Sequence, residues 1–171
     1  MDGHFYALLA RMRYIQRWAL MRNTEPENIQ EHSHMVAILA HALALLQNKH
    51  FGGHIDPGQA VLLALYHDAT EILTGDLPTP IKYYNPALRA SYKEVEETAA
   101  NRLLELLPEE LRGDYAPYLL HPDPELEAVV KAADKLDAYL KCVKERKAGN
   151  GEFQTAQVQI WDALQANPLP A

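Results

Sequence analysis

The sequence has little cysteine and no long apolar run, and both absences exclude classes of protein. Cys142 is the one cysteine, so an internal disulfide is excluded, which fits a reducing cytosol. No N-terminal stretch resembles a signal peptide and no window approaches a membrane span. We therefore expect a cytoplasmic protein without a membrane partner. Its 171 residues, 48% of them hydrophobic, suit a single domain over 1–171 with a core of its own.

The charge balance argues against a nucleic-acid polymer as partner. The net charge is −7, from 23 acidic and 16 basic residues. The segment 11–24 nevertheless contains four arginines and no acidic residue; these are Arg11, Arg13, Arg17 and Arg22. A basic segment in an acidic protein suggests a small anionic ligand. On charge alone, a solvated helix face is the simpler interpretation.

Strand signals are almost absent, whereas helix-capping signals are frequent. "NIQE" at 28–31 has the pattern of a capping box, and "DPGQ" at 56–59 places a cap before a proline. Asn85 and Asp123 are also followed by proline. The sequence thus predicts an all-α bundle of about six helices. These are expected at 3–18, 29–48, 57–74, 86–107, 124–148 and 152–166, with a short helix or turn broken by Pro117 at 109–120.

Three ionisable groups interrupt the apolar stretch "LLALYHDATEIL" at 62–73. Glu71 follows His67 by four residues and Asp68 by three. Residues three or four apart share one face of a helix, so the imidazole and the two carboxylates should converge within one turn. Such groups are costly to bury in an apolar helix without compensation.

Other helices contribute similar groups to their core-facing sides. His32 precedes Val36 by four residues on the predicted 29–48 helix and should point inward, whereas His34 and His41 are expected at the surface. In "VVKAADKLDAYLKCV", Asp134 and Asp137 flank an apolar stripe, and periodicity does not choose between them. That stripe is expected to consist of Val129, Ala133, Leu136, Leu140 and Val143. A divalent cation such as Mn, Fe, Co, Ni or Zn would compensate the burial of all these imidazoles and carboxylates better than a separate partner for each would.

The order His32, His67-Asp68, Asp134 resembles the H…HD…D signature of the HD superfamily of metal-dependent phosphohydrolases. The strings "RWALMRN", "ENIQEHS", "FGG", "YHDATEILTGDLPTPIKYYN" and "KAADKLDAYLKC" resemble its bacterial 5′-deoxynucleotidases (YfbR-like). The resemblance covers about residues 4 to 155. That family has Cys or another residue near the position of Asp137, so the resemblance favours Asp134 as the ligand.

The resemblance implies an all-α fold around a divalent metal (Co, Mn, Zn or Fe) held by His32, His67, Asp68 and Asp134. A metal-activated water would release phosphate from a deoxynucleoside 5′-monophosphate. Glu71 would handle a proton, or else orient a ligand histidine. The resemblance further implies contacts to phosphate, sugar and base. The phosphate contacts are Arg17 and Lys82, the sugar contacts Trp18 and Asp76, and the base contacts Leu20 and Pro80.

Alternatives remain open at this point. Viral relatives of this fold act on deoxynucleoside triphosphates, so a triphosphohydrolase is the nearest alternative. A non-catalytic nucleotide sensor is the alternative from another class, and a purely structural helical bundle is the third. The family resemblance also implies a homo-oligomer, preferably a dimer.

Overall fold

The computed structural model describes residues 4–82, 84–167 and 169, and within these ranges the chain is helical without strands. An isolated bridge between Gln16 and Asn28 is the one β-type pairing in that part of the chain. The all-α prediction is confirmed. The helices are α1 (His4–Leu9), η1 (Ala10–Tyr14), α2 (Ile29–His50), α3 (Pro57–Tyr66), α4 (Glu71–Thr74), α5 (Thr79–Lys82), α6 (Pro86–Glu105), α7 (Glu109–Leu119), α8 (Pro124–Lys147), η2 (Gly151–Phe153) and α9 (Gln154–Gln165).

The predicted helix caps are present where the sequence placed them. Asn28 and Glu31 form a reciprocal capping box at the start of α2. Asp56 accepts hydrogen bonds from two backbone N–H groups at the start of α3, and Asp123 does the same for α8. These side chains satisfy backbone donors that a helix start leaves unpaired, so they fix where each helix begins.

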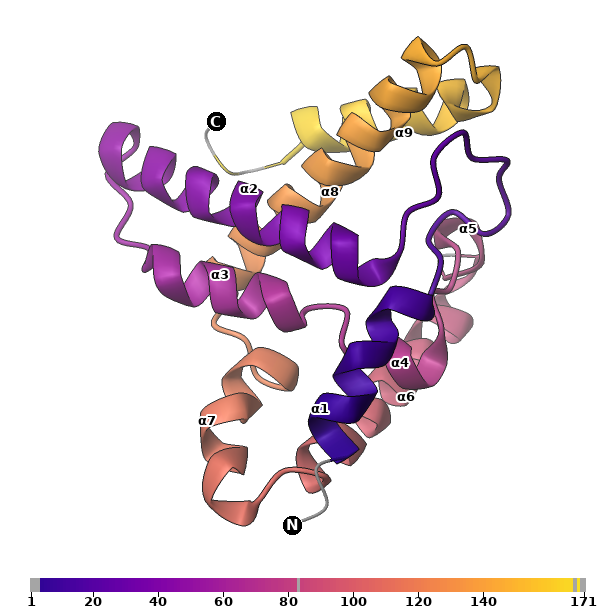
Figure 1. The fold of residues 1–171 in the computed structure, drawn as a ribbon. Coiled ribbons are helices and arrows are strands. Elements are labelled where there is room, and N and C mark those ends of the chain that lie inside the picture. Colours follow the sequence, from indigo (N-terminus) through magenta and orange to yellow (C-terminus); the bar gives the residue numbers. More distant parts are fainter. Residues whose placement is uncertain (1–3, 83, 168, 170–171) are drawn as a thin grey trace.

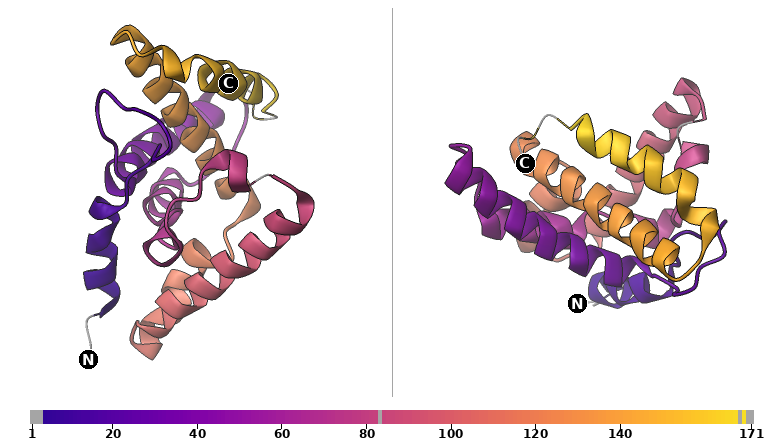
Figure 2. Two further views of the ribbon diagram at one scale, coloured as in Figure 1. Left: turned by 90° about the vertical axis from the view of Figure 1, so that its right-hand side faces the viewer. Right: turned by 90° about the horizontal axis from the view of Figure 1, so that it is seen from above.

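Helices α2, α3 and α8 pack against one another around a core rich in alanine (Figure 1). Ala40, Ala44, Ala60, Ala64 and Ala133 are fully buried there. Small side chains let the helix backbones approach closely, which brings polar groups of the three helices within contact distance. Figure 2 shows α8 between α2 and α9.

A second apolar cluster lies below the first in the view of Figure 1, around α1, α6 and α7. It contains Phe5, Leu103 and Leu107, each at most 2% exposed. Ala69 also belongs to this cluster, while Ala64 belongs to the first. The segment that carries His67 and Asp68 therefore lies between the two apolar clusters.

Several predicted boundaries were wrong. The first helix, α1, ends at Leu9 and the 3₁₀ helix η1 follows it to Tyr14, whereas a helix to residue 18 was expected; 15–28 is irregular. The predicted helix 57–74 is interrupted at 67–70, where backbone hydrogen bonds tighten to three-residue spacing, as from Glu71 N–H to the Asp68 carbonyl. Helix α7 contains Pro117 and ends two residues later, at Leu119, so the predicted break at this proline was wrong.

The apolar stripe predicted for α8 is also only partly correct. Val129 and Ala133 are fully buried, but Leu140 is 37% exposed. The C-terminal half of α8 instead buries three charged side chains, Asp137, Lys141 and Glu145. Each has polar partners that compensate its burial, which hydrophobic periodicity does not reveal.

Within the described residues, none of the helices combines the length and the apolar character that crossing a membrane requires.

Candidate metal centre and its surroundings

His67 lies at the C-terminal end of α3, where its ring is fixed by the backbone. Its Nδ1 lies 2.7 Å from the Ala64 carbonyl oxygen and donates to it. The proton of the neutral ring is therefore on Nδ1, and Nε2 carries the lone pair. That Nε2 lies 3.2 Å from Asp68 Oδ2.

The four groups expected at the metal lie close together, although they come from three separate parts of the chain. His32, His67 and Asp68 each offer one ligand atom, and these atoms all lie within 4.8 Å of one another. Asp134 approaches from α8, with Oδ1 3.1 Å from His32 Nε2. His32 Nε2 also lies 3.6 Å from Asp68 Oδ2. His34 and His41 are exposed, as expected.

Two ligand atoms at this centre are buried without a hydrogen-bond partner. They are Nε2 of His32 and Nε2 of His67, and Glu71 Oε2 beside them is buried and unpartnered too. Unsatisfied buried polar atoms are costly, and a cation would satisfy both imidazoles at once. Nitrogen and carboxylate oxygen donors together suit a divalent transition metal.

Mutual interactions shift the pKa values of the ligand groups. Burial opposes protonation of His67, but the neighbouring Asp68 carboxylate outweighs it and raises the pKa of His67 to about 9. Burial likewise opposes ionisation of Asp68, yet His67 holds the pKa of Asp68 far below its usual value. Desolvation opposes ionisation of Asp134, but the adjacent imidazole of His32 and the charge of His67 lower its pKa. The charges of the two imidazoles and two carboxylates thus interact strongly, as expected of side chains that surround one cation site.

Glu71 begins α4 on the same side as the ligand groups. Burial, followed by the negative charges of Asp68 and Asp76, raises the pKa of Glu71 to about 10. A carboxyl group with such a raised pKa holds its proton near neutral pH and can donate it.

Arg17 lies beside this centre but not on a helix, contrary to the expectation. Its Nη1 lies 2.5 Å from Glu27 Oε1 and 2.7 Å from His32 Nδ1, and its Nη2 is 3.7 Å from Asp134 Oδ1. Glu27, His32 and Asp137 form a second cluster with ligand atoms within 4.8 Å. Because the guanidinium contacts all three, it already supplies the positive charge there.

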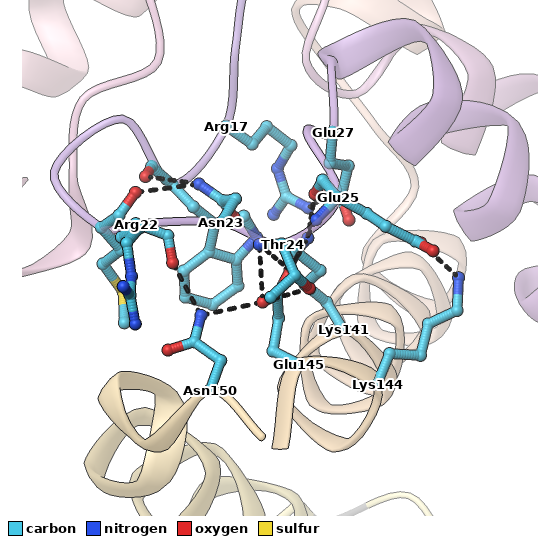
Figure 3. Close-up of polar contacts among 12 residues, drawn as sticks. Arg17, Arg22, Asn23, Thr24, Glu25, Glu27, Lys141, Lys144, Glu145 and Asn150 are labelled. Carbon is cyan, nitrogen blue, oxygen red and sulfur yellow. Dashed lines mark hydrogen bonds and ion pairs between the residues drawn. The ribbon is translucent and has the colours of Figure 1, made fainter. Parts of the chain in front are cut away.

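The irregular segment 15–28 is fastened to α8 by a buried carboxylate (Figure 3). Glu145, 1% exposed, accepts hydrogen bonds from Thr24 N–H at 2.9 Å and from the Thr24 hydroxyl at 2.8 Å. Asn150 donates to the same carboxylate at 2.9 Å and to the Arg22 carbonyl at 2.7 Å. Lys141 donates to the Glu25 carbonyl and to Glu145. This network fixes the segment that carries Arg17 and Trp18.

Trp18 has an unusual backbone conformation, with φ at 58°. Positive φ is rare for a bulky residue and costs about 1–3 kcal/mol, so the surroundings must hold it. Its ring packs against Phe153, with centroids 5.3 Å apart, and the Arg17 guanidinium lies 5.9 Å from the ring centroid. Its Nε1 is buried without a hydrogen-bond partner.

Of the other expected substrate contacts, Asp76 lies close enough to Arg17 and Asp68 for their charges to act on its carboxyl group. Lys82 Nζ lies 2.6 Å from Glu96 Oε1 and 4.7 Å from the Tyr92 ring centroid. Burial raises the pKa of Asp76, which is partly exposed. Leu20 is 71% exposed. The side chain of Pro80 lies outside the described part of the structure.

Sequence reasoning missed Glu27, Lys141 and Glu145 altogether. Lys141 and Glu145 carried one detectable signal, because they continue Asp137 at four-residue intervals along one face of α8. Nothing local marks Glu27, since its partner Arg17 is ten residues away across an irregular segment.

The all-α fold that brings these histidines and aspartates together is shared with HD-domain phosphohydrolases. An HD-domain phosphohydrolase from Listeria innocua (lin2634) has the same fold, with TM-score 0.81, 23% identity, and coverage of 92% of this chain and 77% of that one. The HD phosphohydrolase DatZ of cyanophage S-2L, solved bound to dA and one catalytic Zn²⁺ ion, aligns with TM-score 0.66 and 23% identity over 96% of this chain and 86% of its own.

Within that class, residues 4–171 match the model of the family "5′-deoxynucleotidase YfbR-like", and the chain belongs to this family. The 5′-deoxynucleotidase VP0926 of Vibrio parahaemolyticus is 53% identical, covering 99% of this chain and 88% of its own length. The 5′-deoxynucleotidase of Shewanella oneidensis is 51% identical with the same coverage. The protein is a metal-dependent phosphohydrolase of the 5′-deoxynucleotidase type.

Proposed function

We propose that His32, His67, Asp68 and Asp134 hold the divalent metal at which this protein hydrolyses deoxynucleoside 5′-monophosphates. The observation that carries this is the convergence of two unpartnered imidazole Nε2 atoms with Asp68 and Asp134. A bound divalent ion supplies Lewis-acid activation of water and of the phosphoryl oxygen. Zn, Co, Mn and Fe all suit the donor set.

Glu71 is proposed to move a proton in the reaction. Hydrolysis forms a bond between the water oxygen and phosphorus and breaks the bond from phosphorus to the 5′-oxygen. A proton leaves the water and one must reach the 5′-oxygen. Glu71 lies close enough to Asp68 of the ligand set for the two carboxylates to interact, so it is placed to take the proton from the water or to give one to the leaving oxygen.

The remaining substrate contacts are those that the family resemblance implies. Arg17 can direct its guanidinium to phosphate oxygens, and Lys82 is the second proposed phosphate contact. Trp18 would pack on the deoxyribose and crowd a 2′-hydroxyl, while Asp76 would accept a hydrogen bond from the 3′-hydroxyl. Leu20 and Pro80 are proposed at the base. A cytoplasmic location and a homo-oligomer, preferably a dimer, complete the proposal.

Product analysis tests the reaction. Protein loaded with Co²⁺ or Mn²⁺ should convert dAMP into deoxyadenosine and phosphate, with much less turnover of AMP. A His67→Ala variant, carried as control, should bind less metal and lose activity. Release of triphosphate from dATP, without turnover of dAMP, would favour the triphosphohydrolase alternative. Tight binding of deoxynucleotides without any product would favour the sensor.

A further inference from the structure

Each of the two ligand histidines has a different partner on the ring nitrogen that faces away from the proposed metal. His67 Nδ1 donates to the Ala64 carbonyl, which is only an acceptor. His32 Nδ1 lies 2.6 Å from Asp137 Oδ2, and both side chains are buried, with His32 fully enclosed and Asp137 11% exposed. The proton of a metal-ligating imidazole is commonly held by such a carboxylate or carbonyl.

His32 Nδ1 has a second neighbour that demands the opposite arrangement. Arg17 Nη1 lies 2.7 Å from the same nitrogen, and a guanidinium can only donate. If Asp137 accepts from Nδ1–H, the lone pair is on Nε2 and faces Asp68 and Asp134. If Arg17 donates to Nδ1, the proton of the neutral ring is on Nε2, which then has no lone pair for a metal.

We propose that Asp137 is a positioning residue that holds the proton of His32 on Nδ1, against the competing guanidinium of Arg17, so that Nε2 is free to bind the metal. This inference rests on the metal site proposed above. Asp137 itself is not a ligand, because it lies on the Nδ1 side of the ring and Asp134 lies on the Nε2 side.

Glu27 restrains the competitor in the same arrangement. Its Oε1 lies 2.5 Å from Arg17 Nη1, and Asp137 Oδ2 lies 3.9 Å from that nitrogen. Glu27 thus hydrogen-bonds the guanidinium, whereas Asp137 hydrogen-bonds the imidazole. Substitutions at the two carboxylates therefore distinguish two effects. Neutralising Glu27 removes a nearby negative charge, whereas substituting Asp137 with an apolar residue removes the acceptor on Nδ1.

Three variants test the acceptor. Asp137→Leu keeps approximate volume but removes the acceptor, and it should weaken Zn²⁺ binding about 10–100-fold, measured by competition with a chromophoric chelator. Asp137→Asn keeps an acceptor oxygen without charge and should stay close to the unmodified protein. Glu27→Gln is the matched control and should change Zn²⁺ affinity far less than Asp137→Leu. If Asp137→Asn binds Zn²⁺ as weakly as Asp137→Leu does, the charge of Asp137 is what matters and its role as an acceptor is wrong.

A double-mutant cycle tests the competition with Arg17. Arg17→Met removes a positive charge near the metal and should tighten Zn²⁺ binding somewhat in any background. The gain should be larger in Asp137→Leu than in the otherwise unmodified protein, because only there does Arg17 hold the wrong tautomer. An equal gain in Zn²⁺ affinity from Arg17→Met in both backgrounds would show that Arg17 does not compete with Asp137 for His32 Nδ1.

A spectroscopic measurement separates positioning from mere packing. The visible absorption of bound Co²⁺ reports its ligands, so Asp137→Leu at saturating Co²⁺ should give an altered spectrum and Asp137→Asn an almost unchanged one. A purely structural Asp137 predicts a lower melting temperature with unchanged affinity and spectrum. If His67→Ala binds Zn²⁺ as well as the unmodified protein, the metal site itself is wrong. If His67→Ala loses Zn²⁺ but Asp137→Leu does not, only the role of Asp137 is wrong.

Discussion

Lys141 and Glu145, one turn apart on α8, form an ion pair of 2.6 Å whose side chains are 6% and 1% exposed. The pair lies beneath the segment 15–28 and bonds to its backbone at Thr24 and Glu25. A buried pair of this kind adds little stability over apolar packing, but breaking it leaves one charge uncompensated. Its role here is to fix an irregular segment that carries Arg17 beside the metal ligands.

We predict that Glu145→Ala lowers the free energy of unfolding by about 3–5 kcal/mol, because Lys141 and the Thr24 N–H lose their partner in a buried place. Urea denaturation measures this. Lys144→Ala is the matched control, since the Lys144 side chain is 74% exposed and pairs with Glu25 only at 4.0 Å. Equal effects of the two substitutions would contradict the prediction.

The metal-free protein should lose stability as the pH rises from about 6.5 to 9. The pKa of His67 is about 9 in the folded protein, against about 6.5 in an unfolded chain. The folded state therefore binds this proton more tightly, and the contribution is complete below pH 6.5 and lost through pH 9. Melting temperatures in chelator measure it. His67→Gln should flatten the curve, whereas the exposed His34→Gln should not.

Metal removal should lower the melting temperature near pH 8, and added Zn²⁺ or Co²⁺ should restore it. Binding stabilises the folded state by about 2.7 kcal/mol at a metal concentration one hundred times Kd. The effect should grow with pH, since the ligand imidazoles must be neutral to bind. Calorimetry of the unmodified protein and of Asp68→Asn tests this. A chelator-insensitive melting temperature would speak for a purely structural bundle.

Glu71→Gln should retain the metal but reduce turnover of dAMP about 10²–10⁴-fold, because the amide cannot exchange a proton with water or the leaving oxygen. Metal content by mass spectrometry and kcat on dAMP measure the two effects. Glu94→Gln, an exposed carboxylate on α6, is the control and should keep full activity. Loss of the metal in Glu71→Gln would instead make Glu71 part of the ligand shell.

Trp18→Ala should reduce the preference for dAMP over AMP, because the indole is proposed to crowd the ribose 2′-hydroxyl. The ratio of kcat/KM for the two substrates measures it. Trp161→Ala removes the other tryptophan, which is 47% exposed and packs on Tyr139, and should leave the ratio unchanged. An unchanged ratio in Trp18→Ala would mean that the indole only packs in the core and does not distinguish the two sugars.

Part of the site could be predicted because two of its proposed ligands, His32 and Asp134, lie on regular helices. His32 on α2 precedes the buried Val36 by four residues, so its inward direction followed from periodicity, whereas periodicity left Asp134 and Asp137 on α8 as alternatives. The break of the helix at 67–70 did not follow, since "LLALYHDATEIL" has no glycine or proline to signal it. Arg17 and Trp18 were placed on a helix for the same reason.

The sequence by itself determined the all-α class, the caps that begin α2, α3 and α8, and the ligand candidates, because helix caps and periodicity are local. Periodicity left Asp134 and Asp137 open and the family resemblance favoured Asp134, whereas the tertiary structure places the two carboxylates on opposite nitrogens of His32. It alone revealed the pairs Arg17–Glu27 and Glu145–Thr24. Such contacts join residues of an irregular segment to distant partners, and their energy depends on burial, which no local pattern encodes.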